Sequence, residues 1–127
     1  MLFLCNNMIE INIENILSYK IKQVKDFNKG GFYLILNTRT NKKYIGKSID
    51  YLGRLKQHLY KSNNRTLIDI ELKKSISDYK FYLLHSYNDF DINFFNRNKS
   101  TIIEQKLIKE KKSYYPNGFN VAYYEHI

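Results

Sequence analysis

The stretch GGFYLILNTRTNKKYIGKS, residues 30–48, constrains the fold of this chain more than any other. Two runs rich in aromatic and aliphatic residues, 31–37 and 43–48, flank a polar turn. This pattern predicts two strands joined as a hairpin. The turn is too short for the crossover that parallel strands need, so the strands must be antiparallel. A doubly wound α/β sheet is thereby excluded.

After the hairpin, the apolar spacing changes to the helix period. Leu52, Leu55 and Leu59 share one face of a predicted helix, with Ser48 or Asp50 as its N-cap. A second helix is predicted over about residues 66–77. Its residues at helical spacing are Leu67, Ile70 or Glu71, and Lys74.

The remaining segments predict one more strand and two more helices. KFYLLHSY, residues 80–87, reads as a third strand. A last helix is expected to begin near Lys99, with Thr101 and Glu104 as its capping box. Residues 9–26 fit a helix, although IEINIENI alternates well enough for a strand.

These elements predict a mixed α/β (α+β) fold, a small three-stranded antiparallel sheet flanked by helices. A chain of 127 residues has room for one core. We divide it into an N-terminal extension over residues 1–28, expected to be helical, and a folded domain over residues 29–127.

Composition points to an anionic partner. Twenty-one Lys and Arg face 12 acidic residues, a formal net charge of +9, which favours nucleic acid. Heavy use of Ile, Lys, Asn and Tyr, whose codons are AT-rich, offers a genomic explanation for part of this excess. A single cysteine and the lack of a long apolar run predict a soluble cytoplasmic protein with no membrane partner.

Three polar features are candidates for function. The first is a pair of strand tyrosines, Tyr33 and Tyr44, in triplets that also contain Gly31 and Gly46. Strand tyrosines usually pack in a core. A glycine in the same triplet removes side-chain bulk, however, and leaves the phenol and the backbone approachable by a ligand.

The second feature is basic. Arg54 and His58 lie four residues apart, so they share a helix face. A solvated surface is the simpler explanation for such a face. The alternative is that it contacts phosphates. The candidate nucleic-acid-binding residues are Lys47, Lys56, Lys61 and Arg65.

The third feature is Glu104, at the edge of the apolar ridge made by Ile103, Leu107 and Ile108. A carboxylate near a core needs a hydrogen bond, a counter-charge or a metal. Its capping-box role at Thr101 would supply the first. A divalent metal is the alternative, because Mg²⁺ takes one or two carboxylates and keeps several waters.

Together these residues resemble the GIY-YIG nuclease family. Gly31-Phe32-Tyr33 stands at its first triplet, with Phe for Ile, and Tyr44-Ile45-Gly46 matches its second. Arg54 and His58 match its helix arginine and the frequent His or Tyr partner. Glu104 resembles its metal-binding glutamate, and Asn120 in NGFNVA its terminal asparagine. The resemblance covers roughly residues 29 to 123.

The resemblance implies a fold and a chemistry. Glu104 would hold one hydrated Mg²⁺, for which Mn²⁺ can substitute, against the scissile phosphate. Arg54 would stabilise transition-state charge, and Tyr33 would take the proton of the attacking water, assisted by Tyr44 or His58. Asn120 would fix the site or contact phosphate. A free phenol has a pKa near 10, so Tyr33 needs the metal and Arg54 to depress that value.

The implied function is a metal-dependent endonuclease that hydrolyses double-stranded DNA, one strand per active site. A homodimer is expected if both strands are cut. Composition suggests a phage or another mobile element, and thus a homing-type role. A restriction-type enzyme, a branched-DNA repair nuclease and a non-catalytic nucleic-acid-binding module are the alternatives.

Overall fold

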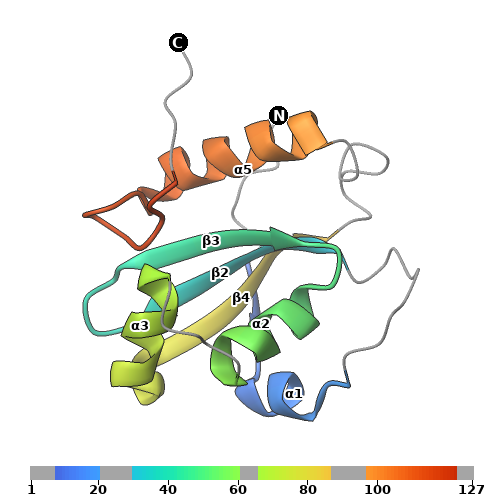
Figure 1. The fold of residues 1–127 in the computed structure, drawn as a ribbon, viewed down its shortest axis with the longest axis vertical. Helices are drawn as coiled ribbons and strands as arrows, with labels where there is room; N and C mark the ends of the chain where they lie inside the picture. The colour runs from blue at the N-terminus through green and yellow to red at the C-terminus, as the bar shows by residue number, and fades with distance from the viewer. Residues whose placement is uncertain (1–7, 21–29, 61–65, 87–96, 123–127) are drawn as a thin grey trace.

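The computed structural model of the chain describes residues 8–20, 30–60, 66–86 and 97–122 (Figure 1). Its strands are β1 (Ile9–Ile11), β2 (Gly31–Asn37), β3 (Lys43–Ser48) and β4 (Tyr79–Ser86). Its helices are α1 (Ile13–Ser18), α2 (Tyr51–Tyr60), α3 (Leu67–Lys74) and α5 (Arg97–Lys111), with a 3₁₀ turn, η2 (Ile76–Asp78).

The strands form one antiparallel sheet in the order β1-β4-β2-β3. The predicted α+β class is therefore confirmed, as is the hairpin of β2 and β3. The prediction of three strands is wrong, because β1 pairs with β4 and adds a fourth. Ile9–Ile11 alternates like a strand, and the helix begins only after Asn12, whose side chain accepts from the Glu14 amide.

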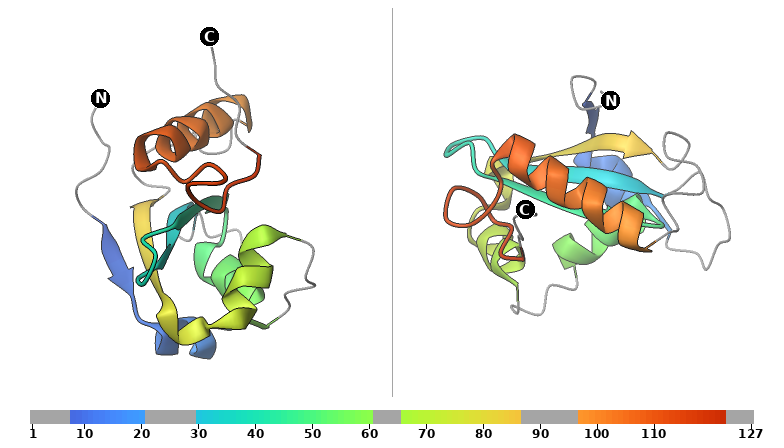
Figure 2. Two further views of the ribbon diagram at one scale, coloured as in Figure 1. Left: turned by 90° about the vertical axis from the view of Figure 1, so that its left-hand side faces the viewer. Right: turned by 90° about the horizontal axis from the view of Figure 1, so that it is seen from above.

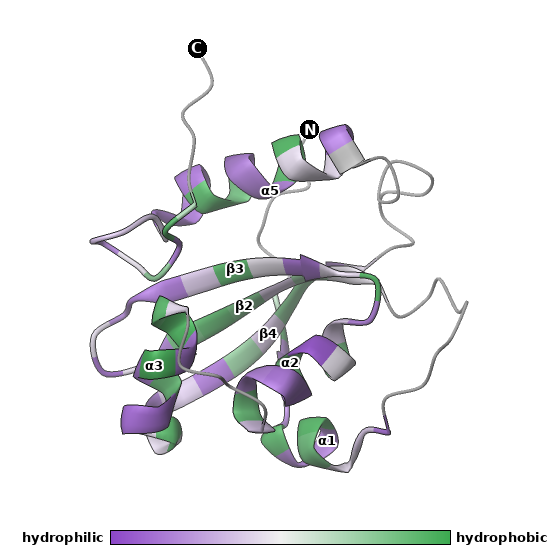
Figure 3. Cartoon of the chain, in the orientation of Figure 1, coloured by the Kyte–Doolittle hydropathy of each residue, from purple (hydrophilic) through white to green (hydrophobic). Residues whose placement is uncertain are grey.

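Helices cover both faces of the sheet. α5 lies on one face, and α1, α2 and α3 lie on the other (Figure 2). β2 is buried along nearly its whole length, and its side chains alternate between the two faces. Tyr33 and Ile35 belong to the cluster beneath the three helices, whereas Phe32 and Leu34 pack with Leu107 under α5. Figure 3 shows the hydropathy of these elements: β2 is mostly hydrophobic, whereas hydrophilic and hydrophobic residues alternate along α5.

Two helices differ from their predicted form. α3 buries Ile68 and Leu72, and with them Asp69, so its buried face is not the predicted stripe through Leu67 and Lys74. α5 starts at Arg97, which places Thr101 inside the helix. The predicted capping box is therefore wrong, and the Thr101 hydroxyl instead accepts a hydrogen bond from Lys47 (3.0 Å).

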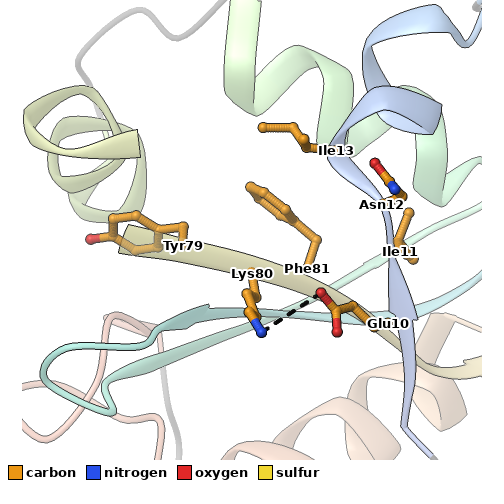
Figure 4. Close-up of a pocket in the computed structure, with 7 residues that line it drawn as sticks. All are labelled: Glu10, Ile11, Asn12, Ile13, Tyr79, Lys80 and Phe81. Atoms are coloured by element: carbon orange, nitrogen blue, oxygen red, sulfur yellow. Dashed lines mark ion pairs between the residues drawn. The ribbon is translucent and has the colours of Figure 1, made fainter. Parts of the chain in front are cut away.

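A pocket of about 460 Å³ opens where β1 meets β4 (Figure 4). Ile13 and Phe81 lie on one side of these strands, and the ion pair of Glu10 with Lys80 (4.0 Å) lies on the other. The candidate tyrosines do not line it. Among the described residues, no helix has the length and apolar character needed to cross a bilayer.

Candidate active site

The two candidate tyrosines lie on neighbouring strands, on the face covered by α2. Their ring centroids are 6.4 Å apart. Tyr33 is paired across the hairpin with Gly46. A side chain at Gly46 would overlap the Tyr33 ring and hydroxyl, so the glycine lets that ring lie across β3. At Gly31 a β-carbon would stand 2.6 Å from the His85 carbonyl oxygen, so that glycine permits close strand packing.

His58 on α2 completes an aromatic cluster with these tyrosines. Its ring stands edge-on to both, with centroids 5.8 Å from Tyr33 and 5.7 Å from Tyr44. The Tyr33 hydroxyl lies 2.9 Å from His58 Nε2. Asp50 positions α2 by accepting the Gly53 amide at its N-terminus (3.2 Å). The structure thus brings together residues that are far apart in the sequence.

A buried carboxylate that the sequence did not predict stands behind His58. Asp69 Oδ1 on α3 lies 2.7 Å from His58 Nδ1, and Asp69 is only 8% exposed. Thr66 caps α3 and donates its hydroxyl to Asp69 Oδ2 (2.8 Å). The signal was present in TLIDIEL, because Thr66 and Asp69 have N-cap and N3 spacing and Ile68 and Leu72 repeat at i, i+4.

Burial sets the charge states of this cluster. Desolvation lowers the pKa of His58, and hydrogen bonding to Asp69 raises that pKa by less. A neutral imidazole carries one N–H, and a carboxylate can only accept, so the proton belongs on Nδ1. Nε2 is then left to accept from the Tyr33 hydroxyl.

Both tyrosines are neutral phenols at neutral pH. Burial raises the pKa of Tyr33 well above its ordinary value, the Tyr44 phenol raises it further, and the Arg54 guanidinium lowers it by less. Burial, followed by the Glu104 charge, raises the pKa of Tyr44 to about 12. The protein groups around Tyr33 therefore do not depress its pKa, in contrast to what a free phenolate base requires.

Two charged residues reach this cluster from different helices. Arg54 on α2 is exposed and donates to Gln57 (3.1 Å), and its guanidinium lowers the pKa of the nearby Tyr33 phenol. Glu104 belongs to α5, on the opposite face of the sheet. Its charge raises the pKa of both Tyr33 and Tyr44, so the carboxylate acts on the tyrosine cluster from that side of β3.

Glu104 has the character of a ligand for one hard cation. In the described part of the chain it makes no hydrogen bond or ion pair, yet it is half-buried, and burial raises its pKa. The neighbouring Lys47 lowers that pKa by less. No group of three or more His, Cys, Asp or Glu that could hold a metal occurs among the described residues. A single open carboxylate fits a largely hydrated Mg²⁺ better than a zinc cage.

Asn120 contacts the outer edge of β3. Its amide accepts from the Ile45 N–H (2.8 Å) and donates to the Ile45 carbonyl (2.9 Å). The Ser113 hydroxyl donates to the same amide oxygen (2.7 Å). Asn120 is 6% exposed, so these contacts occupy an amide that has little access to solvent. We call this arrangement the Asn120 clamp.

The candidate nucleic-acid-binding lysines are engaged within the fold. Lys47 donates to the Ser100 hydroxyl (2.7 Å) as well as to Thr101. Lys56 donates to the Tyr19 carbonyl (2.6 Å) and links α2 to the segment after α1. Lys61 and Arg65 fall outside the described residues.

Comparisons with known proteins identify the family of this chain. The chain is 28% identical over 109 residues to a protein of Neurospora crassa named "Probable intron-encoded endonuclease 1". The alignment covers 86% of this chain and 33% of that protein, so the chain spans about a third of the relative's length. No solved structure matches. The family profile described as GIY-YIG catalytic domain matches residues 29–120, and the chain therefore belongs to the GIY-YIG nuclease family.

Proposed function

We propose that this chain is a metal-dependent endonuclease domain that hydrolyses phosphodiester bonds in double-stranded DNA. The observation that carries the proposal is the convergence of Tyr33, Tyr44, Arg54, His58 and the Glu104 charge from four elements. The name of the Neurospora relative, an intron-encoded endonuclease, supports a homing-type role in a mobile element. A cytoplasmic setting in a bacterial cell or phage-infected host is part of the same proposal.

Each residue has a role that its surroundings support. Tyr33 receives the proton of the attacking water, and His58, at hydrogen-bond distance, assists the transfer. Arg54 is exposed beside the Tyr33 hydroxyl and stabilises charge on the phosphoryl oxygens. Tyr44 orients the phosphate. The Asn120 clamp holds the strand that carries Tyr44.

The metal we propose is Mg²⁺, with Mn²⁺ as a substitute, held by Glu104. When bound, the cation supplies charge neutralisation at the phosphate. Lys47 stands next to this carboxylate, where its charge favours the ionised form. It is therefore a candidate phosphate contact as well as a tether between β3 and α5.

One site of this kind cuts one strand. We therefore propose nicking as the elementary reaction, with a double-strand break requiring a homodimer or a second binding event. The net charge of +9 supplies the general attraction to the DNA backbone.

The test is cleavage of supercoiled plasmid in Mg²⁺ or in EDTA, with wild type, Glu104→Gln and Glu110→Gln. Glu110 is an exposed carboxylate on the same helix, so its variant is the matched control. We expect nicked product only with metal, for wild type and Glu110→Gln. Equal cutting by Glu104→Gln would refute the metal site. Binding of DNA without cutting under any condition would favour the non-catalytic module.

A further inference from the structure

Asp69 is a buried acidic residue to which the proposed mechanism assigns no role. Its two carboxylate oxygens have different partners, because Oδ1 faces His58 Nδ1 at 2.7 Å and Oδ2 accepts from Thr66 at 2.8 Å. Thr66 Oγ1 also lies 3.4 Å from the Asp69 amide, as expected of an N-cap. The carboxylate is thus held from both sides, and it cannot turn away from His58 without losing the hydrogen bond from the Thr66 hydroxyl.

This arrangement determines which nitrogen of His58 can take a proton. The Asp69 carboxylate accepts, so Nδ1 keeps its hydrogen and Nε2 stays bare. Nε2 faces the Tyr33 hydroxyl at 2.9 Å. If the hydrogen were on Nε2, the imidazole would donate to Tyr33 and could not receive the tyrosine proton.

The titratable groups around His58 come from the sheet, from α3 and from α2 itself. Tyr33 and Tyr44 face it from the sheet, Asp69 contacts it from α3, and Arg54 lies one turn away on α2. Lys73 of α3 lines a pocket together with His58. Among these, Asp69 is the carboxylate in direct contact with the ring and the neighbour that compensates a positive charge on it.

We propose that Asp69 is a positioning residue that holds His58 in the Nδ1–H form, so that Tyr33 can pass its proton to Nε2 as it takes one from water. This inference rests on the proposed nuclease function. In the step, the water O–H bond breaks and its proton joins the Tyr33 oxygen, while the Tyr33 proton moves to Nε2. The hydroxide so formed attacks phosphorus, the scissile P–O bond breaks, and the leaving oxygen takes a proton from solvent water. His58 ends as an imidazolium paired with Asp69.

This relay is compatible with the raised pKa that burial gives the Tyr33 phenol. A tyrosine that gains one proton as it loses another never needs to exist as a free phenolate. A purely structural role for Asp69, as an acidic residue in the first turn of α3, would predict an effect on stability alone. The two roles therefore differ in what they predict for the tautomer and for kcat.

The first experiment is ¹⁵N NMR of the imidazole of His58 in the full chain, labelled on histidine and assigned with His58→Gln. We expect wild type to carry its hydrogen on Nδ1. A bare Nδ1 in wild type would overturn the proposal by itself, whatever the variants do.

The second experiment compares plasmid nicking by wild type, Asp69→Asn, Asp69→Ala and Glu71→Gln. Glu71 lies on the same helix, pairs with Lys74 near the surface and is the matched control. We expect kcat to fall about 100-fold in both Asp69 variants, with the Kd for DNA unchanged and with Nε2–H appearing in the NMR spectrum. An Asp69 variant that is folded, keeps its Nδ1–H signal and cuts at the wild-type rate overturns the inference. If wild type cuts no DNA, the proposed function fails instead, which is a distinct result.

Discussion

The Tyr33 hydroxyl is closely surrounded by other residues of this site. Gly46 makes room for it, His58 accepts its hydrogen and Arg54 lies beside it. Burial keeps the phenol neutral by raising its pKa, so its reactivity depends on partners that move its proton. Reactivity at the residue scale is therefore a property of the hydrogen-bonded chain Tyr33–His58–Asp69.

Removal of one oxygen atom should separate chemistry from folding. We expect Tyr33→Phe to reduce nicking at least about 100-fold, because proton transfer is lost. The ring still fills its place, so stability should fall by only about 1 to 3 kcal/mol, the cost of leaving His58 Nε2 unpaired. Tyr82→Phe, which removes a hydroxyl on the α5 side of the sheet, is the control. Equal loss in both variants would contradict a specific role.

The lowered pKa of His58 predicts how stability depends on pH. The unfolded chain binds a proton near the ordinary pKa of 6.5, whereas folded His58 resists it. Its contribution is therefore complete above 6.5 and is lost as the pH falls toward the lowered folded pKa. Urea unfolding should show the free-energy difference between wild type and His58→Gln shrinking as pH is lowered from about 7.5 to about 5.5. A difference that stays constant would mean that folded His58 titrates normally.

At the scale of elements, the predictions succeeded where segments that are neighbours in the sequence also contact each other in the fold. The β2–β3 hairpin depends on alternation and a short turn, both of which are visible in residues 31–48. For residues 9–11 the strand remained an alternative to a helix, because three residues carry little pattern, and pairing with β4 decides between the two. Asp69 was missed because the choice of buried face on α3 depends on α2 and the sheet, which lie elsewhere in the chain.

The Asn120 clamp should be a stability element of the whole hairpin. We expect Asn120→Ala to lower the free energy of unfolding by roughly 2 kcal/mol or more, because the backbone groups of Ile45 lose their partners. Asn117→Ala, an exposed change in the same turn, should be nearly neutral. Chemical denaturation measures both. A stable Asn120→Ala protein with weak cleavage would instead favour a direct phosphate contact.

Gly46 should tolerate substitution less well than a strand glycine that is needed only for its backbone conformation. Its φ is not positive, so alanine is permitted by the backbone, but the new methyl group would overlap Tyr33. We expect Gly46→Ala to cost about 1 to 3 kcal/mol of stability and to displace the Tyr33 hydroxyl from His58. Nicking should therefore fall together with the thermal midpoint. A normal rate in a folded variant would show that Tyr33 has room to adjust.

At the scale of the whole molecule, positive charge is in excess, and some cationic side chains lie close together. Lys43 and Lys111 lie close enough for burial and mutual repulsion to lower the pKa of Lys43. Lys43 is the first residue of β3 and Lys111 the last of α5, on a protein whose net charge is +9. A polyanion alongside would relieve this repulsion.

DNA affinity should accordingly depend steeply on salt. With Glu104→Gln in EDTA, to prevent cutting, we expect the Kd for a DNA duplex to rise at least about tenfold between about 50 and 200 mM salt. Fluorescence anisotropy measures this directly. Lys111→Met should reduce the slope if Lys111 contacts a phosphate, whereas Lys74→Met, paired with Glu71 on α3, should leave it unchanged. Affinity independent of salt would exclude backbone contacts as the main source of binding.

The Asn120 clamp also bears on self-association of the protein at high concentration. An outer strand with free N–H and C=O groups is a template for intermolecular pairing and fibril growth. On β3, Asn120 occupies both groups of Ile45, and the Phe119 N–H occupies the Lys43 carbonyl (2.8 Å). The opposite edge is β1, which is three residues long and offers a short template. We therefore expect this one buried amide to limit aggregation through β3 at the high concentrations of overexpression.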